Sequence, residues 1–316
     1  MNTIEKVAVC SRSFSRNPTL RSELLSKYSQ VTFNDSGTQL DGDDLVDFLK
    51  GHTKAITALE KISDSILAQL PELKAIGKYG VGLDMIDLRA MEKYGVRLGW
   101  RPGVNKRSAA ELTLAFAIMM LRGIPQASAE VRSGIWSQFT GGLLTGKTVG
   151  IIGCGNIGKD LVRMLEPFEC QILIHDITLD LSFNDLYKIQ PVPLEDLLKQ
   201  SDIVTLHLPL NGSTRNIISA DRLLLMKSSA ILINAARGGL VDEGALKLSL
   251  HTNGIAGAAF DVFIDEPPSD YELLTSPNFI ATPHIGGSSK EAILAMGRAA
   301  IEGLDINKNA TDFINE

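Results

Sequence analysis

GCGNIG, residues 153–158, follows the apolar run TVGII of residues 148–152, and Asp176 directly follows the next apolar run, QILIH of residues 171–175. Strand, glycine turn, helix, second strand and acidic residue, in this order, are the fingerprint of a dinucleotide-binding βαβ unit. The first glycine allows the tight turn, the second lets the backbone approach a pyrophosphate, and the third lets the helix pack closely on the sheet. The helix N-terminus offers unpaired N–H groups and a positive dipole end to the phosphates. We therefore expect a nucleotide site here rather than a merely structural turn.

Length, charge and cysteine content restrict the class of protein. A chain of 316 residues suits two domains, and the fingerprint lies near its middle, so another domain must fold from the first half. The net charge of −6 gives no electrostatic footprint for nucleic acid or for an anionic membrane surface. Cys10, Cys154 and Cys170 have no metal-ligand or disulfide spacing, which favours a reducing cytoplasm and predicts no metal site. No targeting segment is expected, and the apolar stretch 112–121 is interpreted as a buried helix rather than a membrane span.

The first hundred residues alternate between short strands and helices. Strands are expected at 6–10, 30–33, 55–58, 73–77 and 97–100, and helices at 19–27, 43–50, 63–69 and 87–94. This order predicts a parallel sheet wrapped by helices, a small flavodoxin-like domain. RPGVN at residues 101–105 predicts a hinge. Ser108 and Glu111, three residues apart, predict a capping box at the start of a helix over residues 109–122. This helix is apolar on nearly every side, so we expect it to lie in a domain core or in an oligomer interface.

The second half predicts a complete doubly wound nucleotide-binding domain. Strands are expected at 148–152, 171–175, 203–206, 230–234, 257–260 and 279–281, and helices at 157–165, 194–198, 220–226 and 243–250. An amphipathic helix over residues 290–304 is expected to cross back to the first domain. The predicted fold class is therefore α/β with two doubly wound domains. A Rossmann domain over residues 105–288 is inserted in a flavodoxin-like substrate domain of residues 1–104 and 289–316.

Asp176 indicates which dinucleotide binds. A carboxylate at this position can accept hydrogen bonds from the adenosine ribose hydroxyls and would repel a 2′-phosphate. No Arg or Lys follows closely, since the next residues are ITL at 177–179. The sequence therefore predicts NAD rather than NADP.

Three side chains that suit acid–base chemistry follow neighbouring strands. Arg237, Glu266 and His284 each lie just past a predicted strand, at the sheet edge where ligands of open α/β sheets bind. The guanidinium fork suits a carboxylate and a carbonyl oxygen together, and a histidine can pass a proton near neutral pH when a carboxylate fixes its tautomer. Each residue alone could have a purely structural role, with Arg237 as an ion-pair partner, Glu266 as a solvated acid and His284 as a turn cap. Together they favour a catalytic site beside a nicotinamide.

These motifs resemble a known family. The chain from Lys74 to its C-terminal helix is similar to the NAD-dependent D-isomer-specific 2-hydroxyacid dehydrogenases, which include D-3-phosphoglycerate, D-lactate, glyoxylate/hydroxypyruvate and phosphite dehydrogenases. The resemblance rests on residues 153–158 with Asp176, 234–243, 261–267 and 282–287. It implies hydride transfer between NADH and the carbonyl carbon of a 2-oxoacid, with Arg237 holding the carboxylate and carbonyl, His284 as the acid/base and Glu266 as its partner.

The resemblance also implies further contacts. The substrate carboxylate is expected to bind the backbone amides of Tyr79, Gly80, Val81 and Gly82. Asp261 is expected to bind the nicotinamide amide, and Thr113 to lie near the cofactor. The full set of expected cofactor contacts is Thr113, Gly153, Gly155, Asn156, Ile157, Gly158, Asp176, His207, Pro209, Thr214, Ala235, Ala236, Asp261, Gly286 and Gly287.

The substrate and the assembly are less defined by the sequence. Arg12 after the first strand and Arg101 at the hinge either meet a distal phosphate or second acid, or lie in ordinary solvated loops. If they bind, 3-phosphoglycerate or another doubly anionic acid is favoured over lactate; phosphite is disfavoured because Val81 stands where phosphite-oxidising relatives have a lysine. The resemblance implies a homodimer formed through the region that begins at the apolar helix, and a short form without a C-terminal regulatory domain. The alternative function is an NAD-sensing scaffold like the corepressors of this fold, although no long disordered tail favours it.

Overall fold

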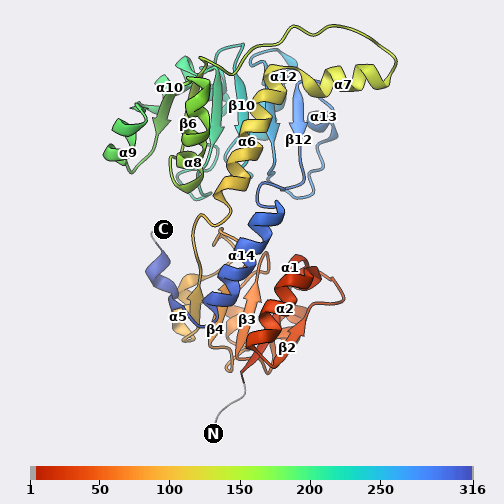
Figure 1. The fold of residues 1–316 in the computed structure, drawn as a ribbon, viewed down its shortest axis with the longest axis vertical. Helices are drawn as coiled ribbons and strands as arrows, with labels where there is room; N and C mark the ends of the chain where they lie inside the picture. The colour runs from red at the N-terminus through yellow and green to blue at the C-terminus, as the bar shows by residue number, and fades with distance from the viewer. Residues whose placement is uncertain (1–4, 315–316) are drawn as a thin grey trace. The chain divides into compact units, whose positions relative to one another are not determined.

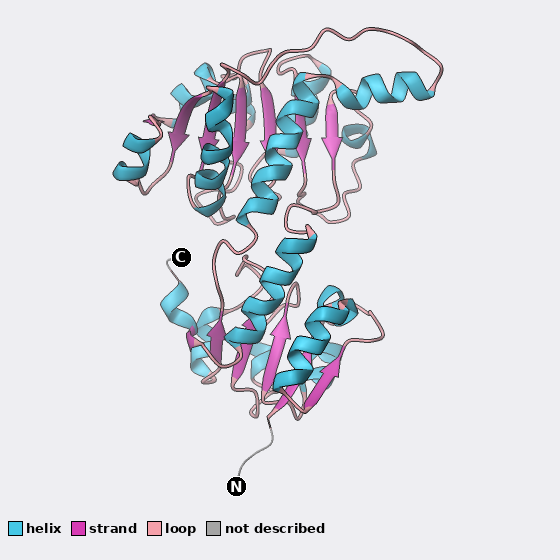
Figure 2. Ribbon diagram, in the orientation of Figure 1, coloured by secondary structure: helices cyan, strands magenta, loops and turns pink. Residues whose placement is uncertain are grey.

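The computed structural model describes residues 5–314, which divide into two compact units. Within this range, unit 1 is formed by residues 5–105 and 289–314, and unit 2 by Lys106–Ser288. In each unit, helices lie on both faces of a mostly parallel sheet (Figure 1, Figure 2). The predicted α/β fold class is confirmed.

Unit 1 contains a sheet with the strand order β13-β5-β4-β3-β1-β2, in which only β13 runs antiparallel to its neighbour. The strands are β1 (Lys6–Val9), β2 (Gln30–Phe33), β3 (Lys54–Thr57), β4 (Ala75–Lys78), β5 (Arg97–Gly99) and β13 (Lys308–Asn309). The helices are α1 (Arg12–Arg16), α2 (Pro18–Lys27), α3 (Gly42–Leu49), α4 (Asp64–Leu67), α5 (Leu88–Lys93), α14 (Lys290–Gly303) and the 3₁₀ helix η2 (Ala310–Phe313).

The central strands β1, β3 and β4 of unit 1 are buried on both faces, which agrees with their largely apolar sequences. Val7 and Val9 of β1 pack with α2 and α14 on one face of the sheet. The alternating residue Ala8 packs with α3, α4 and α5 on the other face. Alternation along a strand thus divides the core of unit 1 into two layers.

Helix α14 lies against β4 and β5 so closely that only glycine fits between them. A Cβ atom on Gly77 would lie 2.2 Å from the carbonyl oxygen of Ala300, and one on Gly99 would lie 2.0 Å from the carbonyl oxygen of Gly303. Real Cβ atoms do not approach backbone oxygens to such distances. The helix that follows unit 2 in the sequence is therefore an integral part of the core of unit 1.

Unit 2 contains an entirely parallel sheet with the order β12-β11-β10-β9-β6-β7-β8. Its strands are β6 (Thr148–Ile152), β7 (Gln171–His175), β8 (Gln190–Pro191), β9 (Ile203–Leu206), β10 (Ile231–Asn234), β11 (Gly257–Phe260) and β12 (Phe279–Ala281). The strand order reverses between β6 and β9, and ligands of such sheets bind outside the carboxyl ends of the strands at this switch point.

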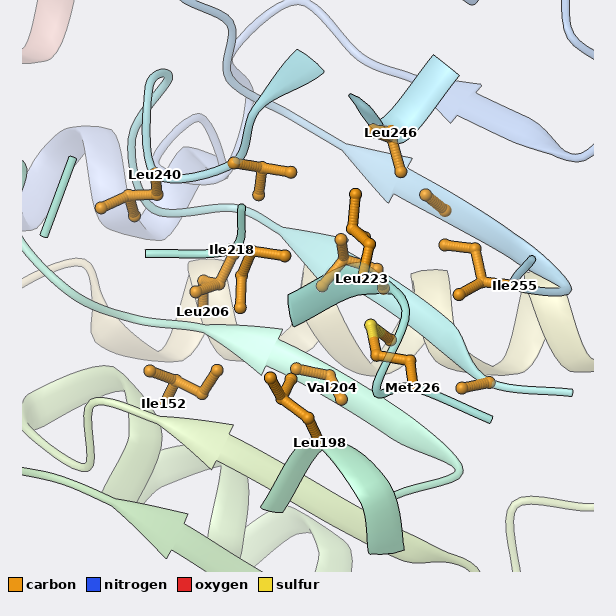
Figure 3. Packing of buried hydrophobic residues seen from close by; sticks show 14 of the residues in the cluster. Ile152, Leu198, Val204, Leu206, Ile218, Leu223, Met226, Leu240, Leu246 and Ile255 are labelled. Atoms are coloured by element: carbon orange, nitrogen blue, oxygen red, sulfur yellow. The ribbon is translucent and has the colours of Figure 1, made fainter. Parts of the chain in front are cut away.

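Helices α6 and α8 cover one face of the sheet of unit 2, and α10 to α13 cover the other. Figure 3 shows the second of these layers, in which Leu198 of α10, Leu223 of α11 and Leu246 of α12 belong to one apolar cluster with Val204 of β9. The helices are α6 (Lys106–Leu121), α7 (Ile124–Arg132), α8 (Asn156–Leu165), η1 (Glu166–Phe168), α9 (Leu181–Leu186), α10 (Leu194–Gln200), α11 (Ala220–Leu223), α12 (Glu243–His251) and α13 (Tyr271–Leu274).

Several predicted bounds differ from the structure by one to three residues, such as β4 (predicted at 73–77), α4 (63–69) and α11 (220–226), and two local predictions differ in kind. Helix α6 begins at Lys106, so Ser108 lies inside its first turn and the predicted capping box of Ser108 and Glu111 is wrong. Residues Arg12–Arg16 form the short helix α1 instead of a loop, because the Ser11 hydroxyl accepts a hydrogen bond from the backbone N–H of Phe14 and the Phe14 ring is buried. Among the described residues, no single helix meets the length and hydropathy of a membrane span. Helices α6 and α7, which are bent by 63° at the break between them, meet that test only when taken together.

The contact between α14 and β5 predicts the effect of one added methyl group. The variant Gly99→Ala should lower the stability by roughly 3 kcal/mol, because overpacking a backbone–backbone contact forces the helix to shift. The melting temperature, followed by far-UV circular dichroism, should therefore fall by several degrees. The control variant is Gly212→Ala, because Gly212 has no atom within 4 Å of the position of a Cβ and no positive φ. Equal melting temperatures for the two variants would contradict the prediction.

Candidate active site

Three glycines shape the turn after β6, each for a different reason. Gly153 has a φ of 91°, and a Cβ on it would lie 2.6 Å from the carbonyl oxygen of His207 at the end of β9. A Cβ on Gly158 would lie 2.6 Å from the carbonyl oxygen of Gly153, so the third glycine lets α8 approach the turn. A Cβ on Gly155 would meet nothing within 4 Å. The surface above Gly155, at the N-terminus of α8, is therefore open to a pyrophosphate, and Asn156 and Ile157 begin the helix there.

Asp176 is fixed against this turn. Its carboxylate accepts hydrogen bonds from the backbone N–H of Cys154 at 2.6 Å and from that of Thr178 at 2.9 Å. A carboxylate has about four acceptor sites, so it can also accept from the hydroxyls of a ribose. Burial, followed by the charge of Asp176, raises the pKa of the Cys154 thiol to about 11, so this cysteine is not a nucleophile at neutral pH.

The end of β9 carries an imidazole on the other side of the switch point. Burial lowers the pKa of His207 to about 4, so its ring is neutral at physiological pH. Its Nε2 atom lies 3.1 Å from the Thr205 hydroxyl, whereas Nδ1 is buried without a hydrogen-bond partner among the described residues. An unsatisfied buried nitrogen beside the glycine turn agrees with a site that a polar ligand completes.

The loop after β10 presents Arg237. The Asn234 side chain accepts a hydrogen bond from the backbone N–H of Ala236 and donates one to the carbonyl of Arg237, which closes the loop. The Arg237 guanidinium donates to the carbonyl of Ala236 at 2.7 Å. Ala235 and Ala236, which precede it, are buried. The Asn234 side chain thus fixes the conformation of the backbone that carries Arg237.

A buried carboxylate organises the loop after β12. Asp261 is 1% exposed, and its carboxylate accepts from the Thr282 hydroxyl at 2.5 Å and from the N–H groups of Ile285 and Gly286 at 2.7 Å each. The carbonyl of Asp261 also accepts from the backbone N–H of His284 at 2.9 Å. His284 has a φ of 54°, a left-handed conformation that costs a non-glycine residue free energy and persists only where the surroundings enforce it. The bonds to Asp261 enforce it here.

His284 and Glu266 form a hydrogen-bonded pair. The distance between Nδ1 of His284 and Oε2 of Glu266 is 2.8 Å, and both side chains are less than half exposed. The other oxygen of Glu266 accepts from the backbone N–H of Phe263 at 3.2 Å. Because the carboxylate accepts a hydrogen bond from Nδ1–H, the Nε2 atom is left to exchange a proton with a ligand.

The three predicted catalytic residues therefore follow β10, β11 and β12, which are adjacent in one sheet. Gly286 lies against Asp261, and the half-buried Gly287 follows it. Two of the expected cofactor contacts have local partners: the Thr113 hydroxyl donates to the carbonyl of Ala109 within α6, and the Thr214 hydroxyl donates to the carbonyl of Pro209. Each of these hydroxyls is hydrogen-bonded to nearby backbone, and the predicted contacts of Thr113 and Thr214 with the cofactor stay predictions.

The expected substrate residues lie in unit 1. Gly80 has a φ of 128° that favours glycine, and the buried Tyr79 accepts a hydrogen bond from Ser13 at 3.4 Å. The indole N–H of Trp100 donates to the carbonyl of Val81 at 3.1 Å, so the segment up to Gly82 is tied to β4 and β5.

The two arginines whose role the sequence left open have different surroundings. Arg101 pairs with Glu302 of α14 at 2.7 Å and lines, with Trp100, a cavity of about 290 Å³ in unit 1. Arg12 is exposed on α1 and makes no ion pair with any residue of the described range 5–314.

Residues that support the site were not identified from the sequence as positioning groups. Asn234 and Glu243 each bond the backbone of a site loop, and the Thr282 hydroxyl donates to the carboxylate of Asp261. Asn at a strand end before a turn is a recognisable signal, because its side chain can replace backbone partners. The other two act across about 20 residues, which no local pattern reveals. Within residues 5–314, no group of His, Cys, Asp and Glu side chains could hold a metal ion.

Known proteins share this architecture. Residues 114–286 match the family model described as "D-isomer specific 2-hydroxyacid dehydrogenase, NAD binding domain". The chain is 40% identical over 245 residues to the D-3-phosphoglycerate dehydrogenase of Methanocaldococcus jannaschii, and the match covers 77% of this chain and 47% of that one. It is 36% identical over 273 residues to the D-3-phosphoglycerate dehydrogenase of Escherichia coli strain K12, and this match covers 84% of this chain and 66% of that one. The chain thus spans about half the length of the first of these relatives.

A solved structure is also similar over nearly the whole chain. The putative D-isomer specific 2-hydroxyacid dehydrogenase of Polaromonas superposes with a TM-score of 0.87 at 28% identity, covering 95% of both chains. More than half of the present chain matches the NAD-binding domain model, and that match includes the glycine turn and the three strand-end loops. The protein belongs to the D-isomer specific 2-hydroxyacid dehydrogenase family.

Proposed function

We propose that the protein is an NAD-dependent oxidoreductase that interconverts a D-2-hydroxyacid and its 2-oxoacid. The observation that carries the proposal is the convergence of Arg237, Glu266 and His284 on adjacent strand ends of the nucleotide-binding unit, with 2.8 Å between the imidazole and the carboxylate. The relatives reported above are named as dehydrogenases, which does not favour the alternative of a scaffold without turnover.

The residues of unit 2 fit NAD. The turn of residues 153–158, with the open surface above Gly155, would hold the pyrophosphate, and Asp176 would hold the adenosine ribose hydroxyls. When bound, NAD supplies or accepts the hydride at the carbon that carries the substrate oxygen.

The protein side of the reaction follows from the geometry of the pair. In the reductive direction, Nε2 of His284 gives its proton to the carbonyl oxygen as negative charge develops there, and in the oxidative direction it takes the hydroxyl proton. The Glu266 carboxylate keeps the ring oriented and compensates the positive charge of the imidazolium. The Arg237 guanidinium binds the substrate carboxylate and stabilises the developing charge on the neighbouring oxygen.

For the substrate we propose a 2-hydroxyacid with a second anionic group, such as 3-phosphoglycerate. Two curated relatives carry the name of that dehydrogenase. Arg12 supports the proposal, since it is exposed and makes no ion pair within residues 5–314, whereas Arg101 is already paired with Glu302. Ser13, next to Arg12, bonds the hydroxyl of Tyr79 in the loop expected to bind the substrate carboxylate.

We further propose that two copies of the chain form a homodimer through the surface called here the apolar arm, Ile124–Arg132 with residues 133–143. Several of its side chains are far more exposed than a monomer needs, with Trp136 at 86% and Leu143 at 68%. A second copy of the same surface would bury them. The free thiols Cys10, Cys154 and Cys170 support a reducing compartment such as the cytoplasm.

Turnover tests the acid–base role directly. The variant His284→Asn, assayed with NADH and a panel of pyruvate, glyoxylate, hydroxypyruvate and 3-phosphohydroxypyruvate, should lose about 1,000-fold in kcat while NADH binds normally, because general acid–base catalysis contributes this order of magnitude. His251→Asn is the control, since His251 is the last residue of α12 and its ring meets Ser276 and Glu272 rather than a residue of the proposed site. Normal NADH binding by the wild type without turnover of any member of the panel would refute the enzymatic function, and normal turnover by His284→Asn would refute the role of His284.

The role of Asp176 predicts a change in coenzyme preference. In Asp176→Asn the negative charge that opposes a 2′-phosphate is gone, so the ratio of kcat/KM for NADH to that for NADPH should fall about tenfold, or about 1.4 kcal/mol. The exposed Asp185→Asn on α9 is the matched control. An unchanged ratio would show that Asp176 does not read the ribose.

The apolar arm predicts the outcome of a sedimentation experiment. The double variant Trp136→Ser/Phe139→Ser should raise the dimer dissociation constant by roughly 100-fold, because buried aromatic residues dominate interface energies. The control Leu224→Ser/Leu248→Ser removes two comparably exposed apolar side chains from the C-cap of α11 and from α12. A wild-type protein that sediments as a monomer would contradict the proposed dimer.

A further inference from the structure

The peptide unit between Phe263 and Ile264 lies between two loops of the site. On its carbonyl side, Gly238 approaches so closely that a Cβ on it would lie 1.9 Å from the oxygen of Phe263. On its amide side, the N–H of Ile264 donates to Oε1 of Glu243 at 2.9 Å. Gly238 directly follows Arg237, so the loop that carries the arginine packs on this one peptide.

The same turn leads directly to the acid–base pair. The preceding N–H, that of Phe263, donates to Oε1 of Glu266, and Oε2 of Glu266 meets Nδ1 of His284. Two carboxylates therefore hold two successive amides of one turn. Glu243, which lies outside the turn, accepts from the N–H of Ile264. Glu266, which lies within the turn, accepts from the N–H of Phe263 and also orients the imidazole of His284.

The position of Glu243 indicates that its carboxylate serves the turn rather than its own helix. Glu243 is the first residue of α12, but the capping bond of that helix comes from Asp242, whose side chain accepts from the N–H of Ala245. Burial raises the pKa of Glu243, the charges of Asp265 and Asp270 raise it further, and the bond from Ile264 lowers it. The carboxylate thus lies in surroundings that disfavour its charge, and the Ile264 amide is the described group that compensates it.

We propose that Glu243 is a positioning residue of the acid–base pair. Its acceptor oxygen fixes the turn of residues 263–266, so that Glu266 stays within hydrogen-bond distance of Nδ1 of His284 while the Arg237 loop remains packed on the same peptide. The inference rests on the proposed function and deepens it. Ile264 is 54% exposed, so water can reach its N–H once the carboxylate is removed, and the turn loosens rather than unfolds.

The first test reads the tautomer of His284 and does not depend on turnover. The ¹⁵N spectrum of the histidine side chains distinguishes a protonated Nδ1 from a protonated Nε2, and comparison with His284→Asn identifies the signals of His284. The wild type and Glu243→Gln, which keeps the acceptor oxygen, should show the Nδ1–H tautomer in the neutral ring. Glu243→Leu should show a mixture of both tautomers, because Glu266 no longer stays in place.

The second test measures kinetics on the same proteins. Glu243→Leu should lose about tenfold in kcat, the equivalent of one hydrogen bond to a charged group, with the NADH dissociation constant unchanged within about twofold, whereas Glu243→Gln should stay near the wild type. Glu195→Leu is the matched control, since it also removes an acidic residue from the first turn of a helix of unit 2. Glu243→Ala repeats the test with no added volume should the leucine variant melt at a lower temperature.

The outcomes separate the positioning role from the proposed function. A wild-type tautomer and kcat in both Glu243→Leu and Glu243→Ala would overturn the positioning role, and so would a Glu243→Gln variant as impaired as Glu243→Leu, because the acceptor oxygen is then not what matters. A mixed tautomer in Glu243→Leu, in a protein whose wild type turns over no 2-oxoacid, would support the positioning role and reject the proposed function.

Discussion

The carboxylate of Asp261 is almost fully removed from water and accepts three hydrogen bonds, all from the loop after β12. An ionised carboxylate is expensive to bury unless such bonds compensate it, and bonds of this kind are the stronger ones in proteins. Here they hold the backbone of His284 in its left-handed conformation and so determine where the imidazole points. That the same carboxylate also binds the nicotinamide amide, as the resemblance to the family implies, stays a prediction.

The parallel sheet of unit 2 brings together three side chains that are far apart in the sequence. Arg237, Glu266 and His284 follow three strands that are neighbours in the sheet, so their distance in space is set by the spacing of strands and not by the 46 residues between the first and the last. Their loops are then joined by side chains: Asn234 closes the first, and Asp261 ties the second to the third. A rigid sheet with cross-bonded loops provides the preorganisation that acid–base chemistry requires.

The sequence was sufficient to predict the strands that are largely buried. Strands β6, β7 and β9 appear at their predicted bounds because strands covered on both faces are uninterrupted apolar runs. The two-residue strands β8 and β13 consist of exposed residues, and no composition distinguishes them from loops. Within the site, strand ends indicated which side chains gather, but not their partners. The pairing of Arg101 with Glu302, and of Ile264 with Glu243, depends on side-chain directions that only tertiary packing decides.

The insertion of α14 beneath β4 and β5 has a consequence for biosynthesis. Residues 5–105 leave the ribosome before unit 2, yet the face of their sheet that contains Val7 and Val9 lacks the cover that α14 supplies until residues 290–303 have been translated. Unit 2 is continuous in the chain and can complete its own core earlier. Nascent unit 1 thus presents a partly uncovered apolar face throughout the synthesis of unit 2, and transiently exposed apolar surface of this kind promotes aggregation.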